Sequence, residues 1–202
     1  ILMALLKETD IVRIYTGPHP SALPQKTIQD DNDVFVCKGE GLKTLEEFEK
    51  LNQLGVDVFC VDSTFTAKSL QVFSLEDLIE LRSLTRNRQK KVYVLINSMI
   101  HQSDLSTLEE LLKSLKEVEV DGIVINDLTV YVLAKSLDMD HLIIYQPGTM
   151  NTDSYSKEYF SQRKVKGITL SRELTLDEIK LICSNTSSIE TSLVIPSLSV
   201  IL

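Results

Sequence analysis

The sequence predicts an α/β fold, namely a TIM-like (β/α) barrel of parallel strands, complete or partial. Two observations lead to this prediction. Short apolar runs rich in β-branched residues alternate along the chain with amphipathic segments of helical spacing. Strand starts recur roughly every 20 to 35 residues, a spacing that suits successive right-handed βαβ units.

The predicted strands are continuous apolar runs, as expected of strands that are covered on both faces. We expect seven strands, and an eighth if residues 11–15 pair with the sheet. The seven runs are residues 34–37, 56–61, 92–96, 123–125, 142–145, 165–170 and 193–195.

The helices between these runs are predicted from their caps and their apolar stripes. In a capping box, a hydroxyl accepts from the third helical N–H while an acid three residues later reaches back. The clearest apolar stripe runs from Leu108 to Val118, and Gly55 suits a left-handed helix end. Four pairs have the capping-box spacing: Thr44/Glu47, Ser74/Asp77, Ser106/Glu109 and Thr175/Glu178.

Parallel βα units either close into a barrel or spread as a doubly wound sheet. The nearly uniform alternation and the lack of an early phosphate-binding fingerprint favour the barrel. At 202 residues the chain lies at the lower size limit of that fold. We divide it into an N-terminal arm, residues 1–32, which holds three of the five prolines, and a barrel domain, residues 33–202.

Composition narrows the class of protein. Hydrophobic residues make up 43% of the chain and charged residues 25%, which is typical of one globular domain. A net charge of −8 argues against direct binding of nucleic acid or of an anionic membrane. No apolar run approaches the roughly 20 residues of a membrane span, and three separated cysteines fit a reducing compartment. We therefore expect a cytoplasmic protein.

The candidate site lies where the predicted strands end, because chemistry in parallel barrels collects at the carboxyl ends of strands. We expect four side chains, each within two residues of such an end, to bind the substrate: Asn97, Asp127, Gln146 and Arg172. A structural alternative stays open. Strand ends also meet water and helix starts need caps, so Asn126 or Asp127 equally fits the cap of the next helix.

Two further residues are candidates for catalysis, Glu173 and His101. An arginine beside an acid after a strand can hold a carboxylate or phosphate in a bidentate manner, with Glu173 orienting Arg172. A structural Arg–Glu pair that closes the barrel rim is the equal alternative. His101 follows the third predicted strand by five residues and could act as a general base, the alternative being a solvated loop histidine.

We expect no metal and no cofactor. His19 and His141 lack metal-ligand spacing to any other residue, and the chain has no Cys-x-x-Cys motif. Two basic clusters, residues 86–91 and 163–166, precede strands and are expected at helix C-termini on the face opposite the site, where the helix dipole favours them. All three cysteines fit buried thiols: Cys37, Cys60 and Cys183.

Four stretches of the chain share a pattern with a known family. They are residues 91–97 with His101 behind them, then 120–127, 148–153 and 167–175. In their order and spacing, these stretches resemble the collagenase-like U-32 peptidase family, and the resemblance extends over residues 34–195. The segment Arg172-Glu173-Leu174 is similar to the family's Arg-Glu-Leu signature and is the most specific match.

The resemblance implies a TIM-like barrel that is catalogued as a peptidase. Family members are also linked to oxygen-independent hydroxylation of RNA bases or of a quinone precursor with an iron–sulfur cluster. This chain departs from the pattern, because Pro196 and Ser197 stand where the family has His-Gly, and Asp153 replaces a family asparagine. No cysteine falls at a cluster-ligand position, so the resemblance does not extend to a cluster.

Two functional hypotheses follow. The first is an enzyme of this family whose barrel binds a small anionic substrate, or one derived from a peptide or an RNA. The residue spacing reveals no nucleophile–base constellation for such an enzyme. The second is a non-catalytic barrel that partners or regulates a full-length family member. The apolar residues 200–202 favour contact with another chain, as a homo-oligomer or with a related partner subunit.

Overall fold

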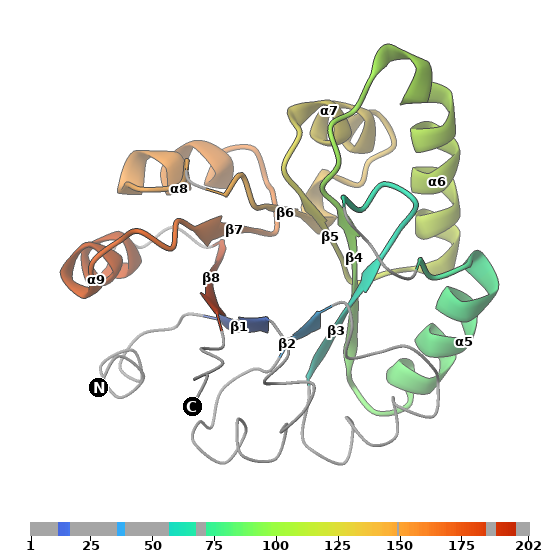
Figure 1. Ribbon diagram of the computed structural model, residues 1–202, viewed down its shortest axis with the longest axis horizontal. Coiled ribbons are helices and arrows are strands. Elements are labelled where there is room, and N and C mark those ends of the chain that lie inside the picture. Colours follow the sequence, from blue (N-terminus) through green and yellow to red (C-terminus); the bar gives the residue numbers. More distant parts are fainter. Residues whose placement is uncertain are drawn as a thin grey trace, which may run out of the picture.

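The computed structural model describes residues 12–16, 36–38, 57–67, 72–148, 150–184 and 189–196. Within these ranges, eight parallel strands pair in chain order, and β1 also pairs with β8, so the sheet closes into a barrel (Figure 1). The strands are β1 Val12–Thr16, β2 Val36–Lys38, β3 Val58–Asp62, β4 Lys91–Ile96, β5 Gly122–Ile125, β6 Ile143–Tyr145, β7 Gly167–Leu170 and β8 Glu190–Pro196.

The predicted barrel is thus confirmed, including the optional eighth strand. β1 comes from within residues 1–32, the segment expected as an arm, and its Val12 to Thr16 lie in register with Ser192 to Pro196 of β8. From the sequence alone, the short apolar run at residues 11–15 could be either a strand of the sheet or part of an arm. In the fold this run completes the ring, because it supplies backbone partners for both β2 and β8.

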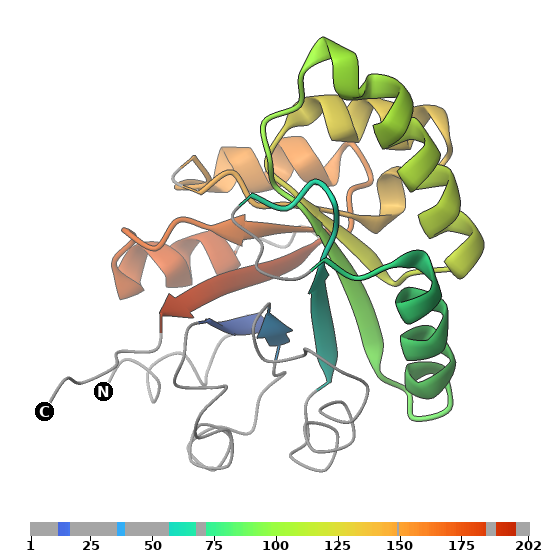
Figure 2. The same ribbon diagram turned by 45° about the vertical axis from the view of Figure 1, so that its right-hand side comes forward.

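The described helices lie outside the ring of strands (Figures 1 and 2). They are α5 Leu75–Arg86, α6 Leu105–Val118, α7 Leu128–Ser136, α8 Ser154–Ser161 and α9 Leu176–Ser184, with two short 3₁₀ turns, η1 Gln102–Asp104 and η2 Asp140–Leu142. None of the helices in these ranges combines the length and apolarity that crossing a membrane requires.

Two of the predicted capping boxes are confirmed. At α5, the Ser74 hydroxyl accepts from the Asp77 N–H at 3.1 Å, and the Asp77 carboxylate accepts from the Ser74 N–H at 3.0 Å. At α9, the Glu178 carboxylate accepts from the Thr175 N–H at 2.7 Å. The Thr44/Glu47 pair and Gly55 lie outside the described residues.

The capping box predicted at Ser106 is wrong. α6 already begins at Leu105, directly after the 3₁₀ turn η1. The acid that reaches back is Asp104, whose carboxylate accepts from the His101 N–H at 2.9 Å. Because the chain turns one step earlier, Ser106 lies inside the first helical turn, and Glu109 pairs with Lys113 at 2.7 Å instead.

The continuous apolar strands divide their side chains between two layers. One layer faces the helices and merges with residues such as Leu108, Leu112 and Leu115 of α6, which are fully buried. The other forms a separate cluster of Val58, Cys60, Tyr93, Leu95, Val124 and Ile144 from neighbouring strands. Both layers are apolar because alternate residues of a buried parallel strand point to opposite faces.

Tyr93 is the largest side chain of this second layer. Its hydroxyl donates to the Glu190 carboxylate of β8 at 3.4 Å, and the Lys166 ammonium lies 5.6 Å from its ring centroid. Burial raises the pKa of the Tyr93 phenol, and the nearby negative charge of Glu190 raises it further. The phenol is therefore held in its neutral, hydrogen-bond-donating form.

The thiols and the basic clusters lie mostly where they were predicted. Cys60 is buried on β3, whereas Cys183 is only partly buried on α9, and the side chain of Cys37 lies outside the described residues. Arg86 ends α5, and residues 163–166 follow α8. Both clusters thus lie at the C-terminal ends of helices, opposite the carboxyl ends of the strands.

Glycine at position 122 is a requirement of the packed barrel. A Cβ built on Gly122 would lie 2.8 Å from Cδ1 of Tyr93, in a ring that is itself buried. We predict that Gly122→Ala lowers the free energy of unfolding by about 1–3 kcal/mol, measured by chemical denaturation. Adding Tyr93→Leu should recover part of this loss. A penalty that is the same in the Tyr93→Leu background would show that the ring is not its cause.

Candidate functional site

The carboxyl ends of four neighbouring strands surround one open cavity of about 290 Å³. It contains three of the four side chains that were predicted to bind the substrate: Asn97 after β4, Gln146 after β6 and Arg172 after β7. The other lining residues are Asn126, Pro147, Gly148, Thr169 and Leu170. We call this cavity the mouth of the barrel.

Asn97 is held in place by the loop that follows β3. The Ser63 and Thr66 hydroxyls both donate to the Leu95 carbonyl at 2.7 Å, which folds this loop across the end of β4. The loop then donates the Ala67 N–H to Oδ1 of Asn97 at 2.8 Å. The orientation of the Asn97 side chain is therefore set by the protein backbone before any ligand binds.

Asn126 completes the same edge of the mouth. The register of β4 and β5 pairs Ile96 with Ile125, so Asn97 and Asn126 follow side by side. The Asn126 side-chain Nδ2 donates to the Asn97 carbonyl at 2.8 Å. Asn126 is thus a site-lining residue, which the sequence left undecided between the site and a helix cap.

Asn151 joins the two strands on the other edge of the mouth. Its side chain is 2% exposed, and its Nδ2 donates to the carbonyls of Tyr145 at 3.3 Å and of Thr169 at 3.0 Å. Its own carbonyl accepts from the Ser171 N–H at 3.0 Å. Because Gln146 and Arg172 directly follow these anchored points, Asn151 fixes the backbone that carries both of them.

Arg172 projects into the mouth as an exposed side chain. Within the described part of the chain, its guanidinium has no ion pair or hydrogen bond, and none joins it to Glu173. Glu173 is exposed and does not line the mouth. The charge of Arg172 is therefore available to an anionic ligand, whereas the orienting role of Glu173 stays a prediction.

Asp127 caps helix α7, which is the structural alternative that its position after β5 had left open. Its Oδ1 accepts from the Thr129 N–H at 2.8 Å and caps α7, while Oδ2 accepts from the Ile100 N–H at 3.3 Å. Partial burial raises its pKa, but these hydrogen bonds outweigh burial and hold the pKa below its ordinary value. Asp127 does not line the mouth, so its predicted contact with substrate stays a prediction.

His101 lies outside the mouth. It is exposed at the start of η1 and does not line the cavity. Its role as a general base therefore stays a prediction. Among the described residues, no cluster of three or more His, Cys, Asp or Glu side chains could hold a metal ion, and Cys60 and Cys183 lie apart in the barrel and on α9. These residues do not fit an iron–sulfur cluster.

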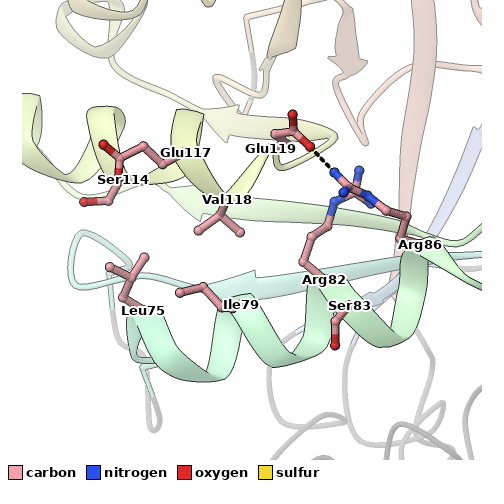
Figure 3. Close-up of a pocket in the computed structure, with 9 residues that line it drawn as sticks. All are labelled: Leu75, Ile79, Arg82, Ser83, Arg86, Ser114, Glu117, Val118 and Glu119. Atoms are coloured by element: carbon pink, nitrogen blue, oxygen red, sulfur yellow. Dashed lines mark hydrogen bonds and ion pairs between the residues drawn. The ribbon is translucent and has the colours of Figure 1, made fainter.

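A larger groove of about 380 Å³ lies outside the barrel, between α5 and α6 (Figure 3). Leu75 and Ile79 contribute its apolar wall, and three of its four charged side chains are already paired. Arg86 forms an ion pair with Glu119, and both terminal nitrogens of Arg82 donate to the carboxylate of Asp121, the residue before β5. Because it lies on the helix layer, away from the strand ends, we place the candidate site at the mouth despite its smaller volume.

The fold and the mouth define a parallel (β/α)-barrel protein with a polar site at the carboxyl ends of its strands. The sequence profile described as Peptidase family U32 matches residues 43–197, which is most of the chain. The chain therefore belongs to peptidase family U32. This confirms the family resemblance that its sequence motifs indicated.

Similar proteins carry names of two kinds. An uncharacterized protease of Methanocaldococcus jannaschii is 34% identical over 113 residues, or 56% of this chain and 27% of that protein. The tRNA hydroxylation protein P2 of Bacillus subtilis is 29% identical over 136 residues, or 67% of this chain and 44% of that protein. The chain thus spans less than half the length of these curated relatives.

A solved structure of a U32 peptidase has the same fold. It superposes with a TM-score of 0.55 and 15% sequence identity, covering 92% of this chain and 68% of the other. At that identity the likeness concerns the fold alone, and it supports the TIM-like barrel that the sequence predicts.

Two residues of the site were not singled out from the sequence, namely Thr169 and Asn151. Thr169 had a detectable signal, since it is a polar residue inside the apolar run of β7 and its hydroxyl lies 2.8 Å from that of Ser192. Asn151 had no such signal, because its importance lies in two carbonyls that only the folded barrel brings within its reach.

The Asn151 anchor can be tested by substitution. We predict that Asn151→Ala lowers the free energy of unfolding by about 1–3 kcal/mol, because two carbonyls at the ends of β6 and β7 lose a buried donor. Denaturant titration measures the loss. Asn87→Ala, at the exposed C-terminal cap of α5, is the matched control and should change stability little. Equal losses in both variants would contradict the assigned role of Asn151.

The cap of α7 gives a prediction with a pH dependence. Asp127→Ala should lower the free energy of unfolding by about 1 kcal/mol, whereas Asp127→Asn keeps an acceptor and should lose less. Because hydrogen bonding lowers the folded-state pKa of Asp127, its charge stabilises the protein fully above the ordinary carboxyl pKa. That stabilisation is lost as the pH falls through the lowered pKa. Denaturation of wild type and Asp127→Asn at several pH values measures the difference, and a gap that widens in acid would contradict it.

Proposed function

We propose that this chain is the substrate-binding barrel of a U32-family enzyme. Its mouth takes up a small anionic substrate, or one derived from a peptide or an RNA. The observation that carries the proposal is the convergence of Asn97, Gln146 and Arg172 on one cavity from three different strand ends. Polar groups that meet at the carboxyl ends of barrel strands are typical of the binding sites of this fold.

The mouth supplies one cation and several neutral amides. Arg172 offers a guanidinium that is exposed and unpaired within the described residues, which suits a carboxylate or a phosphate. Asn97, Asn126 and Gln146 offer amide donors and acceptors, which suit the polar groups of a peptide or a nucleobase. An anion with additional hydrogen-bonding groups is therefore the class of ligand that this chemistry fits best.

The mechanism that follows is one of binding and orientation. Arg172 binds the anionic group, and the amides on the opposite edge orient the rest of the substrate. Both edges are held by hydrogen bonds between a side chain and the backbone, from the Ala67 N–H to Asn97 on one side and from Asn151 to the Thr169 carbonyl on the other, so little reorganisation accompanies binding. Proton transfer by His101 and orientation of Arg172 by Glu173 belong to this proposal as further predictions.

The names of the relatives favour two kinds of substrate. One relative carries a protease name and another a tRNA hydroxylation name. Each of the two matches more than half of the residues of this chain. A peptide and an RNA fragment both combine an anionic group with amide-like groups. The proposed ligand chemistry is common to the two, so the first experiment addresses the anion site itself.

The role of Arg172 is tested with inorganic phosphate as the probe. We predict that Arg172→Gln weakens phosphate binding at least fivefold, measured by chemical-shift titration, because a charge-assisted contact is lost. Arg163→Gln is the matched control on the opposite face, where Arg163 stacks 3.3 Å from the Tyr159 ring centroid. It should leave binding unchanged. Unaltered phosphate binding in Arg172→Gln would overturn the proposed function.

A further inference from the structure

The two asparagines at the β4–β5 edge of the mouth have fixed hydrogen-bonding directions. A backbone N–H can only donate, so the atom of Asn97 that faces the Ala67 N–H at 2.8 Å must be its Oδ1. The Nδ2 of Asn97, a donor, is then left for the cavity. No hydrogen bond engages it within the described part of the chain.

The same argument gives Asn126 the opposite direction. A backbone carbonyl can only accept, so the atom of Asn126 that faces the Asn97 carbonyl at 2.8 Å must be its Nδ2. Its Oδ1, an acceptor, is then left for the cavity. Strand register places the two residues side by side on adjacent strands, about 4.8 Å apart.

We propose that Asn97 and Asn126 together recognise an amide edge of the ligand. By an amide edge we mean a carbonyl oxygen and an N–H that lie side by side and point in the same direction. Asn97 donates to the carbonyl and Asn126 accepts from the N–H. The inference rests on the proposed function, because it names the substrate class of the same mouth. It assigns both asparagines as specificity-determining residues.

The amide edge restricts the class of ligand. A trans peptide group directs its C=O and N–H to opposite sides, so a single peptide bond cannot satisfy both asparagines. A cyclic amide or imide, or a primary carboxamide, presents the two groups on one side. Arg172 extends from β7, two strands further round the rim, so the anionic group lies at the opposite end of the ligand.

Two pairs of small probes separate the two sources of an amide edge. Orotate carries a cyclic imide opposite its carboxylate, and 3-methylorotate lacks the imide N–H. Succinamate carries a primary carboxamide, and monomethyl succinate replaces its NH₂ group by OCH₃. We expect the wild-type chain to bind at least one N–H-bearing probe about fivefold more tightly than its partner, measured by chemical-shift titration. The pair that shows the preference identifies the ring or the open-chain source.

Variants of the chain then assign the preference. Asn126→Leu keeps the bulk that would exclude a methyl group and removes the acceptor, so the fivefold ratio should fall to about one. Asn87→Leu, on the opposite rim, should keep the ratio. Arg172→Gln should weaken both members of a pair equally and also keep the ratio.

The outcomes distinguish the two proposals. Equal binding of both members of each pair by the wild-type chain, with both weakened by Arg172→Gln, overturns the amide-edge inference and leaves the anion site in place. Failure of both orotate and succinamate to bind overturns the inference as well, while the phosphate titration decides the proposed function separately. A ratio that persists in Asn126→Leu would show that the methyl group is excluded by shape alone. If Asn126→Leu does not fold, the wild-type binding ratios of the two probe pairs decide whether the amide-edge inference stands.

Discussion

Closure of the parallel sheet is the constraint on which the rest of the structure depends. β1 pairs with both β2 and β8, so every strand shares its hydrogen bonds with two neighbours that run in the same direction. All strands therefore end at one rim. Asn97 and Arg172, although distant in the chain, line the same cavity because each follows the carboxyl end of a parallel strand in one barrel.

The rim is organised by hydrogen bonds that need no ligand. Ser63 and Thr66 fold the loop after β3 over the end of β4, and the Asn151 side chain donates to the carbonyl of Tyr145, the last residue of β6. These groups leave the donors and acceptors of the mouth in defined directions. A site built in this way recognises a ligand by the direction of its hydrogen bonds as well as by its charge. Membership of family U32 supplies the chemical context, in which relatives bear both protease and tRNA hydroxylation names.

Much of the fold was predictable because its signals are local. Continuous apolar runs indicated strands that are covered on both faces, and the confirmed capping boxes at Ser74 and Thr175 marked where helices begin. The box predicted at Ser106 failed, since Asp104, three residues after His101, accepts from the His101 N–H and the chain turns earlier. A pattern of hydroxyl and acid could not find this start, because His101 has no hydroxyl.

The sequence by itself determined the alternation of strands and helices, the family, and the set of polar residues at strand ends. Only the tertiary structure decided which of those residues face the mouth. Asn126 and Asp127 are neighbours in the chain, yet Asn126 lines the cavity while Asp127 turns to cap α7 and to bind the Ile100 N–H. The physical reason is that a side chain's role depends on which backbone donors and carbonyls lie within its reach. Those partners come from other strands and loops, which no local pattern records.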